Sequence, residues 1–133
     1  MSAKTPPPKI DLETRSSCAV AGTLDLLGDK WTLLLIRDLN LFGTRRFGEF
    51  LQAPEGIPTN LLAERLKRLE HAGLITRQAY QAQPPRYEYR LTPAGEDLQP
   101  VLAALREWGK VHLEGRKPPV WKGAQPALLQ HRH

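Results

Sequence analysis

The apolar residues in the first third of the chain follow the spacing of two α-helices. The first is predicted to run from Cys18 to about Leu27 and to end at Gly28. The second begins after Asp29, which is expected to cap it, and ends at Gly43. This second helix is apolar on almost every side, which indicates a helix buried at the centre of the fold.

A short helix over residues 47–52 and a longer helix over Thr59 to Ala72 follow, with a turn between them. Leucines at positions 62, 66 and 69 form one apolar stripe along the longer helix. The opposite face of that helix is polar and partly cationic, and it carries Asn60, Glu64, Lys67 and His71, with Arg68 beside them.

Two strands are predicted next, over Leu74 to Tyr80 and over Tyr87 to Leu91, and the second has the cleaner alternation. The segment between them, Gln81 to Arg86, is too long for a two-residue turn, so we expect it to project as a loop. Thr92 and Pro93 then have the order of a helix cap and a first helical residue.

The last predicted helix carries side chains spaced alternately by three and four positions, namely Leu98, Val101, Leu105, Trp108 and His112. Pro100 lies within this seam and predicts a kink in the first turns. A seam of this kind packs against a partner helix, and one small domain has little spare surface to bury it. The pattern therefore predicts a homodimer held together by this seam.

This order of elements predicts a fold that is mainly α-helical with a small β-hairpin, as is typical of a winged helix-turn-helix. In that fold the helix over Thr59 to Ala72 enters the major groove of double-stranded DNA, and the hairpin loop reaches the backbone or the adjacent minor groove. The candidate DNA-reading residues on this helix are Thr59, Asn60, Glu64, Lys67 and Arg68. The candidates for contacts to the DNA backbone, including those in the wing, are Arg45, Arg46, Arg65, Arg77 and Arg86.

The charge distribution agrees with a polyanion as partner. Lys and Arg number 19 against 14 Asp and Glu, and the positive excess lies in residues 43–90 and 115–133. We expect residues 1–14 to be a flexible arm, residues 15–114 to form the domain with its dimerisation helices, and residues 115–133 to be a flexible basic tail. A single cysteine and the lack of a predicted signal peptide or membrane span favour the cytoplasm.

Several runs of sequence carry a family resemblance, and they are Asp25 to Trp31, Arg46 to Phe50, Leu62 to Glu70, Tyr87 to Gly95 and Leu105 to Gly109. In order and spacing they resemble the HxlR-type transcriptional regulators over roughly residues 18–110. The resemblance implies bacterial, dimeric regulators, mostly repressors, whose N-terminal and C-terminal helices form the dimer. It also implies that the helix over Thr59 to Arg68 is the recognition helix. Pro58 departs from the Ser or Thr common before such helices, so Thr59 is the candidate cap.

Cys18 has two interpretations. The resemblance implies a redox or electrophile sensor, because some members of the family have such a cysteine near this position. A helix start and the neighbouring Arg15 would both favour the thiolate there. The alternative is a buried small residue that packs the first helix, and the exposure of the thiol separates the two. The effector, whether an electrophile or another small molecule, stays open.

An enzyme is not expected, because the chain has no Gly-rich phosphate loop and no Gly-x-Ser-x-Gly run. None of the four histidines has carboxylates at a useful spacing, and no metal or other cofactor is expected. The remaining alternative is a winged helix that binds RNA or protein without operator specificity. The aromatic residues weigh against RNA, because Trp31, Phe47, Phe50 and Trp108 fall on apolar faces.

Overall fold

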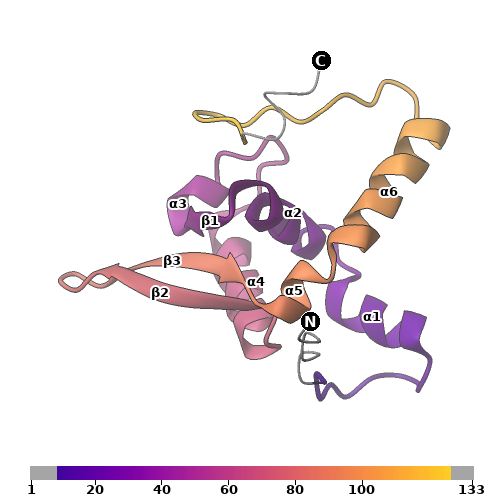
Figure 1. The fold of residues 1–133 in the computed structure, drawn as a ribbon, viewed down its shortest axis with the longest axis horizontal. Helices are drawn as coiled ribbons and strands as arrows, with labels where there is room; N and C mark the ends of the chain where they lie inside the picture. The colour runs from indigo at the N-terminus through magenta and orange to yellow at the C-terminus, as the bar shows by residue number, and fades with distance from the viewer. Residues whose placement is uncertain (1–8, 127–133) are drawn as a thin grey trace, which may run out of the picture.

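The structure is a computed structural model, and it describes residues 9–126 (Figure 1). In chain order its elements are α1 (Ala19–Leu27), α2 (Thr32–Phe42), β1 (Thr44–Arg46), α3 (Phe47–Phe50), α4 (Thr59–His71), β2 (Ile75–Gln81), β3 (Arg86–Leu91), α5 (Pro93–Glu96) and α6 (Gln99–His112). This is a mainly helical fold with a small antiparallel sheet, as the sequence predicts. None of the helices within residues 9–126 is long and apolar enough to cross a membrane.

The sheet has three strands in the order β1-β3-β2, all antiparallel. The hairpin of β2 and β3 extends away from the helices on the opposite side of the molecule from α1 and α6 (Figure 1). The sequence did not predict β1, which pairs Thr44 with Arg90 and Arg46 with Glu88. Three residues are too few to show an alternating pattern, and the pairing partner lies more than forty positions further along the chain.

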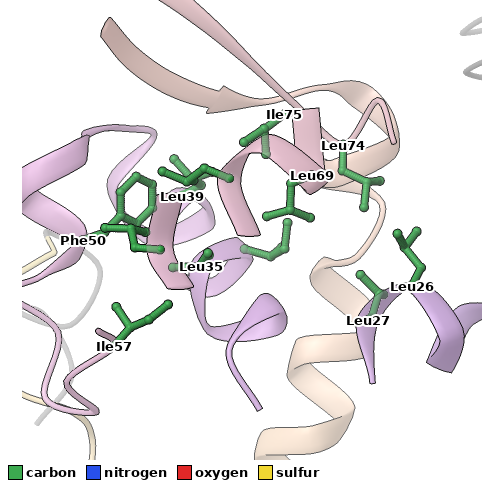
Figure 2. Close-up of a cluster of buried hydrophobic side chains, with 12 residues drawn as sticks. Leu26, Leu27, Leu35, Leu39, Phe50, Ile57, Leu69, Leu74 and Ile75 are labelled. Atoms are coloured by element: carbon green, nitrogen blue, oxygen red, sulfur yellow. The ribbon is translucent and has the colours of Figure 1, made fainter. Parts of the chain in front are cut away.

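The hydrophobic core forms between α2, α3, α4 and the start of β2 (Figure 2). The buried side chains shared among these elements are Leu35, Ile36, Leu39, Phe50, Leu62, Leu66, Leu69, Leu74 and Ile75. The expectation that the second helix is central is confirmed by this set. Each such side chain contributes about 1.5–3 kcal/mol when it leaves water, so the core fixes the orientation of α4.

The side chains of Asp29 and Thr92, which the sequence suggests as caps, accept hydrogen bonds from amides at two helix starts, and Asp29 lies three residues before the first residue of α2. A carboxylate oxygen of Asp29 accepts hydrogen bonds from the amides of Trp31 and Thr32, both at 2.9 Å. The hydroxyl of Thr92 accepts from the amide of Gly95 at 3.2 Å and donates to the carbonyl of Gly73 at 2.6 Å. These bonds satisfy amides that have no partner within their own helix.

The predicted last helix is interrupted rather than kinked. The short α5 ends at Glu96, and α6 starts at Gln99 with Pro100 in its first turn. A proline there lacks only an amide that would have no helical partner, so it favours a new helix start. None of the residues of α6 is buried in the single chain, and this helix extends away from the core (Figure 1).

The first part of the tail, which the sequence predicts to be flexible, packs against the helical core. Residues 115–126 return from the end of α6 across α2, and Trp121 is only 2% exposed. The indole packs edge-on against the ring of Phe42, with the ring centroids 5.4 Å apart. Trp121 is a large apolar side chain in an otherwise polar segment, and it is buried against residues that lie far away in the sequence. Residues 1–8 of the expected arm and residues 127–133 of the expected tail lie outside the described residues.

Candidate nucleic-acid interface

Helices α3 and α4, with the turn between them, form the helix-turn-helix. Because Leu62, Leu66 and Leu69 point into the core, the opposite face of α4 is turned to solvent. Thr59, Asn60, Glu64 and Lys67 all lie exposed on α4, where the sequence placed them.

The first turn of α4 differs from the expected cap. Pro58 precedes the helix in an extended conformation, and Thr59 is already the first helical residue. The amide of Leu62 donates to the carbonyl of Pro58 at 2.9 Å, which is the first bond of the helix. Thr59 therefore does not cap α4, and its side chain belongs to the exposed set.

Arg68 and Arg65 are turned toward the junction of α1 and α2. Nη2 of Arg68 donates a hydrogen bond of 2.7 Å to the backbone oxygen of Asp25, and Nε of Arg65 lies 3.2 Å from Oδ1 of Asp29. Their side chains are 37% and 18% exposed. Both guanidinium groups are engaged within the protein, where they hold α4 in place, and their contact with DNA stays a prediction.

The carboxylate of Asp29 links these elements. Burial would raise its pKa, but hydrogen bonds from the hydroxyl and amide of Thr32, the amide of Trp31 and Arg65 lower the pKa to about 2. Asp29 therefore stays ionised and serves as helix cap and as ion-pair partner at once.

Arg45 is the clearest correction among the candidate backbone contacts. It is 3% exposed, its guanidinium lies 3.7 Å from the ring centre of Phe42, and Nη2 donates to the carbonyl of Glu49 at 2.8 Å. Burial lowers the pKa of Arg45, against the opposing effect of the carboxylates of Glu49 and Asp38. Side chains alternate along a strand, so β1 turns Arg45 inward and leaves Arg46 outside.

The three-stranded sheet carries the remaining candidate cations, Arg46 on β1, Arg77 on β2 and Arg86 on β3. The guanidinium of Arg46 lies 3.8 Å from the ring centre of Tyr80. Arg77 lies 4.3 Å from the ring centre of Tyr87 and pairs with Glu70 of α4 at 3.2 Å. Arg86 is exposed at the start of β3, beside the loop. The structure therefore leaves Arg46 and Arg86 at the surface of the wing and ties Arg77 to α4.

The predicted dimer seam is mostly exposed in the single chain. Leu105 and Trp108 are 53% and 60% exposed, and Val101 lies beside them. The ring of His112 lies 4.8 Å from the ring of Trp108, so these two side chains form one surface. Leu98 differs, because it is half-buried against the core.

The thiol of Cys18 is exposed, at the position just before α1. The interpretation of Cys18 as a buried packing residue is therefore wrong for the single chain. Arg15 does not face it as expected, because Nε of Arg15 donates to Asp25 at 2.6 Å and its amide donates to the same carboxylate at 3.0 Å. These bonds, the amide bond first among them, lower the pKa of Asp25 against the opposing effect of burial.

A model of the HxlR-like helix-turn-helix family matches residues 26–117. The chain belongs to this family. An HTH-type transcriptional regulator of Synechocystis is 43% identical over 102 residues, which are 77% of this chain and 75% of that protein. This HxlR-like protein is thus a transcriptional regulator with a helix-turn-helix DNA-binding fold.

Two solved structures support the same assignment. One from Porphyromonas gingivalis, assigned to the MarR family of transcriptional regulators, is 35% identical to the HxlR-like chain with a TM-score of 0.68. The match covers 77% of this chain and 100% of that one. The redox regulator HypR in its oxidised form is also 35% identical, with a TM-score of 0.65 and coverage of 76% and 100%.

Proposed function

We propose that this regulator binds a pseudo-palindromic operator in double-stranded DNA as a homodimer and represses transcription, in the cytoplasm of a bacterial cell. The observation that carries the proposal is the polar face of α4, which is exposed opposite a fully buried leucine stripe. The repressor role follows from the family resemblance, whose members are mostly repressors.

The exposed face of α4 has the chemistry to read base edges. The amide of Asn60 can pair with N6 and N7 of adenine, and Lys67 can donate to O6 and N7 of guanine. Glu64 can accept from N4 of cytosine, although its carboxylate also pairs with Arg65. In the wing, Arg46 and Arg86 are suited to phosphates, which add affinity without sequence information.

The homodimer is supported by exposed apolar side chains on α1 and α6. Besides Leu105 and Trp108, the exposed set includes Val20 and Leu24 of α1 and Val111 of α6. Pro100, Val101, Ala104, Leu105 and Trp108 together line a shallow apolar hollow on α6. An exposed apolar hollow of this kind is typical of an interface. Both helices lie on the side away from the wing, so pairing there leaves the two wings outermost (Figure 1).

Selection of bound duplexes from a random pool tests the function. We expect enrichment of an inverted repeat whose half-sites are centred about one helical turn, or a multiple of it, apart. Binding to the enriched duplex should weaken steeply with salt, because phosphate contacts release counterions. Recovery of no common sequence, or equal binding of matched RNA, would favour the alternative of an interaction module without operator specificity.

Cys18 is our candidate for the sensing residue, because its thiol is exposed and the similar HypR is described as a redox regulator. Its sulfur can add to a ring carbon of a quinone, which forms an S–C bond, while the thiol proton ends on a ring oxygen. We expect the Cys18→Ser variant to bind the operator normally. It should also stay bound at quinone concentrations that release the wild type from the operator. Wild-type binding that is indifferent to quinones would exclude this role.

A further inference from the structure

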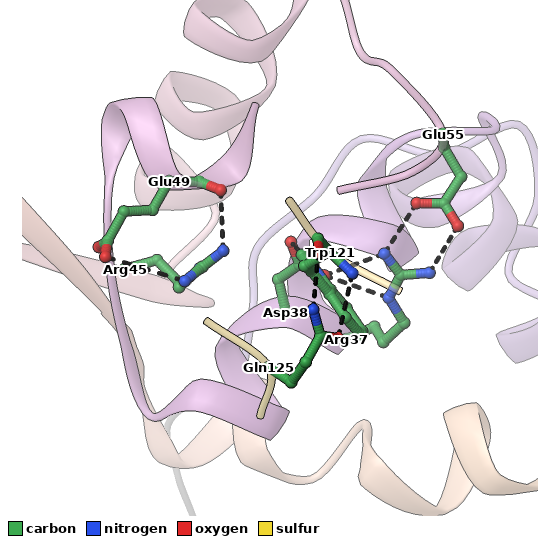
Figure 3. Close-up of polar contacts among 7 residues, drawn as sticks. All are labelled: Arg37, Asp38, Arg45, Glu49, Glu55, Trp121 and Gln125. Atoms are coloured by element: carbon green, nitrogen blue, oxygen red, sulfur yellow. Dashed lines mark hydrogen bonds and ion pairs between the residues drawn. The ribbon is translucent and has the colours of Figure 1, made fainter. Parts of the chain in front are cut away.

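The described end of the chain forms a structured element outside the family match. Residues 119–126, here called the C-terminal strap, follow the family match, which ends at residue 117. Within the strap, the side-chain nitrogen Nε2 of Gln125 donates to the carbonyl of Trp121 at 2.6 Å, and its Oε1 accepts from the backbone amide of Trp121 at 3.1 Å. These two bonds close a small loop that presents the indole to α2 (Figure 3).

The indole of Trp121 is held on three sides. Its Nε1 donates to Oδ2 of the buried Asp38 at 3.2 Å, and its ring lies nearly perpendicular to the ring of Phe42. On the third side the guanidinium of Arg37 lies 4.9 Å from the ring centre. A buried indole with its N–H satisfied and a cation over its face has one defined position.

Arg37 connects this arrangement to the turn between α3 and α4. Its Nη1 and Nη2 donate to the two carboxylate oxygens of Glu55, each at 2.8 Å (Figure 3). Nη2 also donates to Oδ1 of Asp38 at 3.0 Å, and Nε donates to the same oxygen at 3.1 Å. A bidentate pair fixes the carboxylate in the plane of the guanidinium. The hydrogen bonds from Arg37, opposed by burial, lower the pKa of Glu55.

The strap also reaches the turn directly. The amide of Lys122 donates to the carbonyl of Gln52 at 2.8 Å, and a Cβ at Gly123 would lie 3.4 Å from the side-chain amide of Gln52. The turn is therefore held at Gln52 by the strap and at Glu55 by Arg37. Four residues after Glu55 the chain enters α4 at Thr59, the end that carries Asn60.

We propose that Trp121 is a positioning residue for DNA reading, which acts through Arg37 and Glu55 on the turn that sets the N-terminal end of α4. The inference rests on the proposed function, since it assigns a task to the same helix. Recognition geometry must hold to within about 0.5 Å, so a turn fixed at two points favours base discrimination over binding in general.

The test measures discrimination rather than affinity alone. The ratio of the Kd values for the enriched operator and for a duplex changed at the base read by Asn60 is compared among variants. Trp121→Ala and Glu55→Gln are expected to lower this ratio about tenfold, with little effect on binding to unrelated duplex DNA. Trp121→Phe keeps a ring against Phe42 and Arg37 and should retain most of the discrimination. Val120→Ala, at an exposed neighbouring position, is the matched control.

A second readout needs no DNA. Hydrogen exchange of the amides in residues 52–58 should speed up in Trp121→Ala and Glu55→Gln, while amides in the second half of α4 stay protected. A lower Tm for Trp121→Ala with unchanged discrimination and unchanged exchange in this turn would overturn the inference. If the wild type fails to discriminate among duplexes, the proposed function fails, and the exchange rates alone show whether the strap holds the turn.

Discussion

The backbone oxygen of Asp25 accepts a hydrogen bond of 2.7 Å from Nη2 of Arg68, which joins the last turn of α1 to α4 across 43 positions of sequence. Nη1 of the same guanidinium lies 3.9 Å from Oδ2 of Asp29. Arg68 thus stabilises the position of α4, whereas the adjacent Lys67 is exposed to solvent. Neighbouring cations on one helix therefore have different tasks, and substitution should separate them.

We expect Arg68→Ala to lower the free energy of unfolding by about 1–2 kcal/mol, because it removes a charged hydrogen bond that is partly shielded from solvent. Lys67→Ala should change it by less than about 0.5 kcal/mol. In DNA binding, Lys67→Ala should reduce the slope of log Kd against log salt by about one. Urea denaturation measures the unfolding free energy, and salt titrations measure the slope. A reduced slope in Arg68→Ala with little loss of stability would place Arg68 at the DNA.

The lowered pKa of Asp29 predicts that the fold loses stability at acid pH. Its folded pKa of about 2 lies below the ordinary value of 3.8, so ionised Asp29 stabilises the fold above about pH 4. This contribution, about 2 kcal/mol at most, is lost as the pH falls from 3.8 through 2. The difference in unfolding free energy between the wild type and Asp29→Asn should therefore shrink over that window. A difference that is constant with pH would contradict the role of the carboxylate.

The close packing around Gly95 in α5 predicts that any larger side chain at this position destabilises the fold. A Cβ at this position would lie 2.2 Å from the carbonyl oxygen of Leu74, which is backbone and cannot move aside. We expect Gly95→Ala to destabilise the fold by about 1–3 kcal/mol. Gly48→Ala in α3 is the control, because a Cβ there meets no atom within 4 Å, and chemical denaturation should show little loss.

Leu105 tests the dimer surface. Leu105→Lys puts a charge at the centre of the exposed apolar face of α6 and should weaken dimerisation by at least about a hundredfold, since each dimer loses two buried leucines. Val120→Lys, at an exposed apolar position on the strap, should leave the dimer intact. Sedimentation equilibrium distinguishes these outcomes, and a wild type that is monomeric at micromolar concentration would contradict the homodimer.

The central helices could be predicted from the sequence because their signals are local. A run that is apolar on almost every side predicts that α2 lies in the core, and the leucine stripe predicts which face of α4 is turned to solvent. The caps at Asp29 and Thr92 were equally clear, since a cap acts within three residues of its own position.

The features that the sequence did not predict depend on distant partners. Arg45 was assigned to the surface because β1 is too short to show its alternation, and only pairing with β3 turns this side chain inward. Arg68 lies on the polar side of its helix, but its direction is set by the end of α1. Trp121 was one aromatic residue in a polar tail, and its partner Asp38 lies 83 positions earlier.

The central claim is that α4 reads bases in double-stranded DNA, and Asn60→Ala tests it most directly. The base preferences of the wild type and this variant are measured on the enriched operator, with Gln99→Ala on α6 as the matched amide control. The variant should lose preference at one base position in each half-site and weaken binding by about 1–3 kcal/mol, while Gln99→Ala keeps both. Unchanged base preference in Asn60→Ala would contradict the claim.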